Sequence, residues 1–132
     1  MSWGHLIDDR PDEGVFRVHR DAFRDPAVFA QEMVQFFERG WVFVGHASQI
    51  PLPHDYVTVR IGRNPVIISR DDQRNIHALH NSCRHKGAVV CQHSSGNRRA
   101  HLCPYHGWSY ASDGVLSHWR ASWAYDYAER FD

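Results

Sequence analysis

Two short stretches of this 132-residue sequence decide its fold: CRHKG at residues 83–87 and CPYHGW at residues 103–108. The first has the spacing C-x-H and the second C-x₂-H, with seventeen residues between His85 and Cys103. Each stretch follows a segment with strand-forming composition, so each is expected to form a loop at the end of a strand. Two such loops can face each other across a small sheet and combine their side chains into one site.

The rest of the sequence from residue 41 to residue 118 alternates between strand-forming and turn-forming segments. β-Branched and aromatic residues predict strands at 41–45, 56–61, 65–70, 76–80, 99–102, 108–111 and 115–118. Turn-forming residues collect at 51–53, 62–65, 71–75, 94–97 and 112–114. The sequence therefore predicts a small antiparallel β domain with two loops that bind a metal centre.

One helix is expected before this domain, from Pro26 to about Arg39. Asp25 is suited to cap its N-terminus, and Gly40 is suited to the position just after its end. Apolar side chains recur at helical spacing and predict a face that packs in a core: Phe29, Met33, Phe36 and Phe37. Residues 1–20 are expected to form a poorly ordered or extended lead-in.

The predicted organisation is an N-terminal extension with a helix at 1–40 and a β domain at 41–132, which makes a mainly β fold. Hydrophobic residues make up 42% of the chain and charged residues 23%, as in ordinary soluble domains. Fifteen basic and fifteen acidic residues give a formal charge of zero, so the net charge argues against a nucleic-acid partner.

The sequence gives no sign of a membrane anchor or a secretion signal. It has no run of eighteen apolar residues, and its first residues are polar and acidic, so a cytoplasmic location is the default expectation. In that reducing compartment, three cysteines suggest metal binding or free thiols rather than a disulfide framework.

Two thiolates and two imidazoles form a donor set that suits iron. Replacing two thiolates of an iron–sulfur cluster by neutral imidazoles lowers the negative charge of the site and raises its reduction potential. Such histidines also couple electron transfer to proton transfer, because reduction makes their far ring nitrogens hold protons more tightly. The expected chemistry is one-electron transfer, and no catalytic residue is assigned.

A structural zinc site is the rival interpretation, because two cysteines and two histidines also bind Zn²⁺ tetrahedrally. Zinc loops usually space their cysteines C-x₂₋₄-C and their histidines H-x₃₋₅-H. Here each loop supplies one cysteine and one histidine, which favours the iron–sulfur interpretation.

The strings N-S-C-R-H-K-G and C-P-Y-H-G-W-S-Y resemble the Rieske domains of bacterial aromatic-ring-hydroxylating dioxygenases. The resemblance is closest to the large (alpha) subunits of the benzoate and anthranilate type, and it covers roughly residues 14–116. It implies a Rieske [2Fe–2S] cluster held by Cys83, His85, Cys103 and His106. Respiratory-type Rieske proteins add a disulfide between these loops, but Ala88 and Tyr105 occupy the two places here, which implies the lower-potential branch.

The alpha subunits of this family contain a further domain that binds mononuclear Fe(II) through two histidines and a carboxylate. The 26 residues after His106 cannot supply that site, so the sequence resembles the N-terminal part of an alpha subunit, and its β domain need not be complete at the C-terminus. The resemblance implies electron transfer from a reductase or ferredoxin, and ultimately from NAD(P)H, to iron in a catalytic domain or a neighbouring alpha subunit. A beta subunit is a further partner that the resemblance implies.

Two alternatives to that function remain open. One is a stand-alone Rieske ferredoxin, against which the helix before the β domain counts. The other is a truncated product that binds no cluster, although all four ligand residues are present.

Five further residues near the two loops have distinct expectations. Cys91 is expected to be a small buried or free thiol. His80 and His101 each lie five residues before a ligand histidine, but they are not expected to bind metal, because they lie in strands and have no carboxylate at suitable spacing. Trp108 and Tyr110 are expected to cover the cluster and exclude water.

Overall fold

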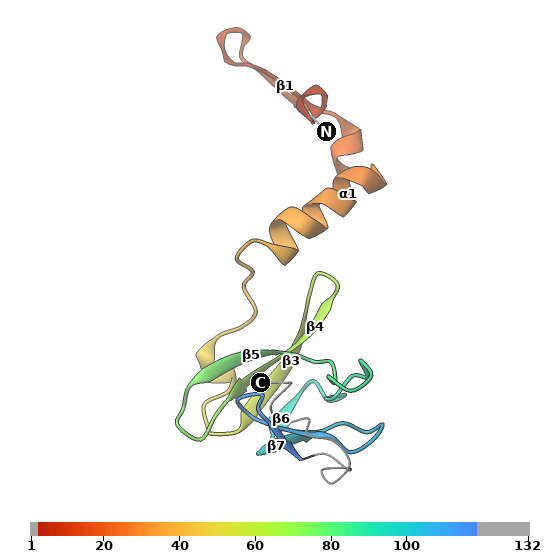
Figure 1. Ribbon diagram of the computed structural model, residues 1–132. Helices are drawn as coiled ribbons and strands as arrows, with labels where there is room; N and C mark the ends of the chain where they lie inside the picture. Colours follow the sequence, from red (N-terminus) through yellow and green to blue (C-terminus); the bar gives the residue numbers. More distant parts are fainter. Residues whose placement is uncertain (1–2, 119–132) are drawn as a thin grey trace. The chain divides into compact units, whose positions relative to one another are not determined.

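The computed structural model describes residues 3–118 and divides the chain into two compact units, one ending at Val42 and one beginning at Phe43 (Figure 1). The C-terminal aromatic residues from Trp119 to Phe131, for which the sequence predicts packing and no element, lie outside the described residues. Within the described residues, no helix is long and apolar enough to cross a membrane.

The first unit begins with a β-hairpin. Strand β1 (Ile7–Arg10) pairs antiparallel with β2 (Val15–Val18), and 3₁₀ turns flank them at Gly4–Leu6, Pro11–Glu13 and Arg20–Phe23. Of the two alternatives predicted for residues 1–20, a poorly ordered lead-in is wrong, whereas an extended one agrees with the two strands. Gly14 closes the hairpin at φ 65°, and the Arg10 guanidinium forms ion pairs with Asp8 and Glu13 at the turn.

The helix begins and ends where the sequence predicts. Helix α1 (Pro26–Glu32) continues as a π-helical segment (Met33–Glu38), and Asp25 Oδ1 accepts a hydrogen bond from Ala27 N at 2.8 Å. A Cβ at Gly40 would lie 2.6 Å from Phe36 O, so the backbone there requires glycine.

The prediction that this helix packs an apolar face into a core is wrong. Phe29 is 61% exposed and Phe36 is 64% exposed. Among the described residues of this unit, Leu6 is the one buried apolar side chain, so within residues 3–42 the helix does not pack into a core.

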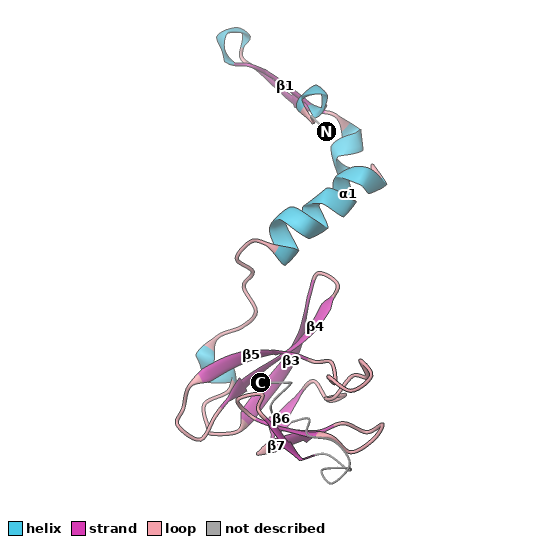
Figure 2. Ribbon diagram, viewed as in Figure 1, coloured by secondary structure: helices cyan, strands magenta, loops and turns pink. Residues whose placement is uncertain are grey.

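The second unit is a small antiparallel β domain, as predicted (Figure 2). One sheet has the order β5-β4-β3-β6, and a second has the order β7-β8-β9. The strands span β3 (Asp55–Ile61), β4 (Asn64–Arg70), β5 (Ile76–His80), β6 (Ser95–Asn97), β7 (Ala100–Leu102), β8 (Ser109–Ala111) and β9 (Leu116–His118). A 3₁₀ turn at Ala47–Gln49 precedes them.

Two local predictions in this unit are wrong. Residues 41–45 form no strand, because within the described residues no strand pairs with them. Residues 95–97, expected in a turn, form the edge strand β6. The Asn97 amide donates to Pro53 O and Asp55 Oδ1, each at 2.8 Å, and these contacts between distant residues override the local turn preference.

Strand β4 lies inside its sheet and is buried on both faces. Val66 and Ile68 pack with Ile50 on one side, whereas Ile67 packs with Tyr56 and Cys91 on the other. This near-continuous burial fixes the register of β4 against β3 and β5, because a shift by one residue would exchange the two faces.

Ser112 connects the two sheets. Its carbonyl oxygen accepts a hydrogen bond from Ser69 Oγ on β4 at 2.5 Å, and its hydroxyl lies 2.9 Å from His54 Nδ1. Both Ser69 and Ser112 are buried. The turn between β8 and β9 is therefore held against the sheet that contains β4, and β8 directly follows the CPYHGW loop.

The turn between β4 and β5 depends on a charged side chain. Asp71 accepts hydrogen bonds from Asn75 N at 2.7 Å and from Asn75 Nδ2 at 2.9 Å, and its Oδ2 lies 2.8 Å from His77 Nε2. The hydrogen bond from His77, followed by those from Asn75, lowers the pKa of Asp71 from 3.8 to about 2.

We expect the free energy of unfolding of Asp71→Asn to depend less on pH in the acid range than that of the wild type. A carboxyl whose pKa is lower in the folded chain stabilises the fold above its unfolded pKa, so this stabilisation is lost as the pH falls from about 4 to about 2. Urea unfolding across this range should show a smaller loss of stability in Asp71→Asn than in the wild type. The control is Asp72→Asn, which changes an exposed neighbour; an equal flattening in the control would contradict the assignment to Asp71.

Candidate metal centre

The two Cys/His loops have the same pattern of backbone hydrogen bonds. In the first, Cys83 N donates to Ala88 O at 2.8 Å and Gly87 N donates to Cys83 O at 2.7 Å. In the second, Cys103 N donates to Trp108 O at 2.7 Å, and the amide four residues after the cysteine donates back to Cys103 O at 3.0 Å. The two cysteines therefore occupy equivalent positions in two equivalent loops.

A glycine in a left-handed conformation allows each loop to form this hydrogen-bond pattern. Gly87 has φ 70° and Gly107 has φ 75°, a region of backbone conformation that side chains with a Cβ rarely adopt. Each glycine lies four residues after its cysteine, at the amide that returns to the cysteine carbonyl. The glycines thus let each loop turn back tightly enough to present its cysteine and histidine on one side.

The structure brings the four predicted ligand residues together in two pairs. Cys83 and Cys103 are 3% and 2% exposed and lie in one apolar cluster with Val90. The rings of His85 and His106 lie side by side, with centroids 4.7 Å apart and an interplanar angle of 66°. The sulfur atoms are therefore buried, whereas His85 is exposed and His106 is partly exposed.

The donors of this site fit a metal centre. Both cysteines are free thiols, and the buried His106 Nδ1 has no hydrogen-bond partner among the described residues. A buried polar atom without a partner costs about 1–3 kcal/mol, and coordination to a metal would remove that cost. Within residues 3–118, no three His, Cys, Asp or Glu side chains gather about a single ion position. The four side chains form one pair of thiols and one pair of imidazoles.

Two aromatic side chains lie where the sequence predicts a cover. Trp108 is 6% exposed and stacks on His85, with ring centroids 4.9 Å apart and an interplanar angle of 6°. Tyr110 Oη lies 3.2 Å from Cys83 Sγ and accepts a hydrogen bond from Arg84 N at 3.0 Å. Because Oη already accepts from Arg84, its own proton is free to be donated to the sulfur atom.

The protonation states favour this arrangement. Burial, followed by the hydrogen bond to Cys83, raises the pKa of Tyr110 far above its ordinary value, so Tyr110 stays a hydrogen-bond donor. Desolvation, followed by the positive charges of His106 and Lys86, lowers the pKa of His85. The neutral imidazole that results is the form that binds metals.

Asn81 also positions the first loop, and the sequence interpretation missed it. It is 3% exposed; its Oδ1 accepts from Val90 N at 3.1 Å and Cys91 N at 2.8 Å, and its Nδ2 donates to Cys91 O at 2.7 Å. These bonds close the loop across its base. In the sequence, this role could have been inferred from the position of Asn81, a polar residue directly between the strand-forming residues 76–80 and the pair Ser82-Cys83.

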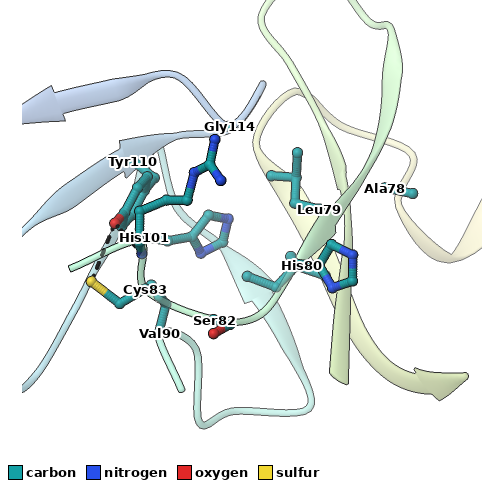
Figure 3. Close-up of a pocket in the computed structure, with 11 residues that line it drawn as sticks. Ala78, Leu79, His80, Ser82, Cys83, Val90, His101, Tyr110 and Gly114 are labelled. Carbon is teal, nitrogen blue, oxygen red and sulfur yellow. Dashed lines mark hydrogen bonds between the residues drawn. The ribbon is translucent and has the colours of Figure 1, made fainter. Parts of the chain in front are cut away.

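Cys91 and the two other histidines near the site lie outside the ligand pairs. Cys91 is a buried free thiol, as predicted, and donates to His93 O at 3.6 Å. His80 and His101 line a cavity of about 620 Å³ beside Cys83. Figure 3 shows Tyr110 joined to Cys83 at one side of this cavity, with Leu79 and His80 at the other. His101 is 2% exposed, its ring packs edge-on against Tyr56, and neither of its nitrogens has a hydrogen-bond partner within the described part of the chain.

Comparisons with known proteins decide between the metal centres that the sequence left open. A family model described as the Rieske [2Fe-2S] domain matches residues 40–126. The large subunit of anthranilate 1,2-dioxygenase from Acinetobacter baylyi is 44% identical over 126 residues, which cover 96% of this chain and 26% of that protein. The oxygenase subunit of glycine betaine monooxygenase from Chromohalobacter salexigens is 45% identical over 107 residues, covering 81% and 24%.

A solved structure supports the same assignment. Naphthalene 1,2-dioxygenase from a Rhodococcus species superimposes with a TM-score of 0.74 at 37% identity, over 82% of this chain and 24% of that one. The chain spans about a quarter of the length of the curated relatives that it matches. It belongs to the Rieske [2Fe–2S] domain family and is homologous to the N-terminal, electron-transfer part of aromatic-ring-hydroxylating dioxygenase alpha subunits.

Proposed function

We propose that this chain transfers single electrons as the Rieske part of an aromatic-ring-hydroxylating dioxygenase alpha subunit. The main support for this proposal is the pair of equivalent loops, which place two buried free cysteines beside two adjacent imidazoles. In the whole enzyme, electrons would come from NAD(P)H through a reductase or ferredoxin and reach a mononuclear iron in a catalytic domain or a neighbouring alpha subunit. A beta subunit is a further proposed partner, and the proposed location is the cytoplasm.

We assign Cys83 and Cys103 as thiolate ligands of one iron, and His85 and His106 as imidazole ligands of the other. When bound, the [2Fe–2S] cluster supplies a one-electron carrier whose potential is raised by its two neutral ligands. Cys83 and Cys103 are buried and would shield the bound cluster from water, whereas His85 is exposed. Trp108 excludes water by stacking on His85.

The substrate proposal comes from the relatives and not from this domain. Dihydroxylation of an aromatic acid is proposed for the whole enzyme, because the anthranilate dioxygenase subunit matches over 96% of this chain. A glycine betaine monooxygenase subunit is equally similar over a shorter span, so the Rieske part does not itself select the substrate. We propose residues 1–40 as the N-terminal extension and 41–132 as the Rieske domain.

A stand-alone Rieske ferredoxin is the second candidate function. It would use the same four ligands but would deliver its electron to a separate protein. The observation against it is the separate first unit, residues 3–42, which precedes the β domain and whose Phe29 and Phe36 are exposed.

The ligand assignment predicts the metal content of the purified chain and of three variants. Anaerobically purified wild type should contain two irons and two sulfides per chain and should give a Rieske-type EPR spectrum after reduction with dithionite. Cys103→Ser and His106→Ala should lose most of the iron and the spectrum, because each removes one of four protein ligands. Cys91→Ser is the matched control and should keep both.

The outcomes separate the alternatives. One zinc per chain without an EPR signal would replace the iron–sulfur proposal with a structural zinc site. Full iron content in Cys103→Ser or His106→Ala would show that the ligand assignment is wrong, even if the cluster is present.

The hydrogen bond from Tyr110 to Cys83 predicts a shift in reduction potential. A hydrogen bond to a ligand sulfur stabilises the more negative, reduced state, so Tyr110→Phe should lower the potential by some tens of millivolts, an order-of-magnitude expectation. Protein-film voltammetry measures this shift. Tyr105→Phe is the control, because Tyr105 is 62% exposed and packs against His106 instead of Cys83. Equal shifts in the two variants would contradict the role of Tyr110.

A further inference from the structure

His54 has a backbone conformation that few residues with a side chain adopt. Its φ is 68°, and among the described residues Arg74 is the one other non-glycine residue with a positive φ. Such a conformation costs free energy and persists only where the surrounding structure imposes it. His54 N donates to Arg70 O at 2.7 Å, and Arg98 N donates to His54 O at 2.9 Å. These bonds to the end of β4 and to the segment after β6 hold the backbone of His54 in place.

The side chain of His54 leaves this sheet and reaches the second one. Its Nδ1 lies 2.9 Å from the hydroxyl of Ser112, a residue that is 4% exposed and directly follows β8. The carbonyl oxygen of the same residue accepts a hydrogen bond from Ser69 Oγ on β4. Ser112 is therefore held by two groups of the first sheet, one at its carbonyl and one at its hydroxyl.

Strand β8 contains the side chain that contacts the first ligand loop. Tyr110 lies two residues before Ser112, and its Oη lies 3.2 Å from Cys83 Sγ and accepts from Arg84 N at 3.0 Å (Figure 3). Hydrogen bonds weaken steeply with distance, so a displacement of β8 by about 0.5 Å takes the contact with Arg84 N to the limit of a hydrogen bond. The position of Ser112 at the end of β8 thus decides how well Tyr110 reaches the sulfur atom.

We propose that His54 is a positioning residue for electron transfer, which sets the contact between Tyr110 and Cys83 by holding Ser112 at the end of β8. This inference rests on the proposed function, which makes Cys83 a cluster ligand, and adds a residue outside both ligand loops that controls the reduction potential. It also accounts for the uncommon φ of His54, because a backbone bonded to two neighbouring strands must also direct the imidazole to the second sheet.

Two substitutions at position 54 separate the effect of the side chain from that of the backbone. Glycine adopts a φ of 68° without strain, so His54→Gly removes the contact with Ser112 and leaves the backbone conformation favourable. Asparagine also tolerates this φ, and its amide nitrogen and oxygen are as many bonds from Cα as Nδ1 of histidine. His54→Asn can therefore keep the contact.

The matched control and a second test variant lie elsewhere in the β domain. Arg74→Gly makes the same backbone change at φ 70°, in the turn between β4 and β5. Ser112→Ala removes the hydroxyl that His54 contacts and keeps the carbonyl oxygen that Ser69 binds. It should reproduce the effect of His54→Gly, and it replaces that variant if His54→Gly does not fold.

The first measurement is the reduction potential of the full, iron-containing chain by protein-film voltammetry. His54→Gly should lower the potential, as Tyr110→Phe does, and by a large part of the same shift. His54→Asn and Arg74→Gly should leave the potential unchanged. In the Tyr110→Phe background, His54→Gly should cause no further decrease, because the hydrogen bond through which His54 acts is already absent.

The second measurement does not depend on the cluster. Arg84 N donates to Tyr110 Oη, so hydrogen exchange at that amide reports the position of β8 relative to the first loop. The amide should exchange about threefold to tenfold faster in His54→Gly than in wild type, and at the wild-type rate in His54→Asn. Mass spectrometry with fragmentation to single residues measures this rate.

Three results would overturn the proposal: an equal decrease of the potential by His54→Gly with and without Tyr110, an equal effect of Arg74→Gly, or no rescue by His54→Asn. Unchanged potential and exchange in both His54→Gly and Ser112→Ala would overturn it as well, while a cluster in these variants would leave the proposed function intact. A chain without iron whose Arg84 amide still follows the expected exchange pattern would support the role of His54 in holding β8, while the proposed function failed.

Discussion

The whole metal centre depends on two backbone hydrogen bonds that are repeated in each ligand loop. The cysteine amide donates five residues ahead, and the amide four residues ahead donates back to the cysteine carbonyl. These bonds need a glycine at positive φ, which Gly87 and Gly107 provide. They also fix where the histidine falls in the loop, at the second place after Cys83 and at the third place after Cys103. The four proposed ligands are therefore positioned by contacts that involve none of their side chains.

The positions of the two loops depend in turn on polar contacts that hold the loops to the sheets. Asn81 closes the base of the first loop, and Ser112 holds the turn beyond the second loop against β4 through Ser69. All three side chains are buried, where an unmade hydrogen bond costs about 1–3 kcal/mol. Such contacts are demanding in geometry, so they position the two cysteines more narrowly than apolar packing alone would.

Most strands, and the two loops that carry the four proposed ligands, could be predicted from sequence because their signals are local. A Cys-x-His or Cys-x₂-His spacing, and a run such as Ile76–His80, is visible within a few residues. The errors concern partners that are distant in the chain. Residues 41–45 have the composition of a strand but pair with no strand within residues 3–118, and β6 forms from turn-prone residues because Asp55 pairs with Asn97. Asn81 escaped notice for the same reason, since its role appears only when Val90 and Cys91 return to it.

The net charge illustrates how an average over the chain can mislead. At physiological salt a charge is felt over roughly 8 Å, so a partner that approaches His85 senses the adjacent Arg84 and Lys86 more than the net charge of the whole chain. The formal charge of zero describes the whole chain, whereas a partner responds to the charge within one screening length of the site. Exposure and pairing decide that quantity, and both become visible only when the loops are folded. Composition can therefore exclude a strongly basic or acidic protein, but it does not describe the surface that a redox partner meets.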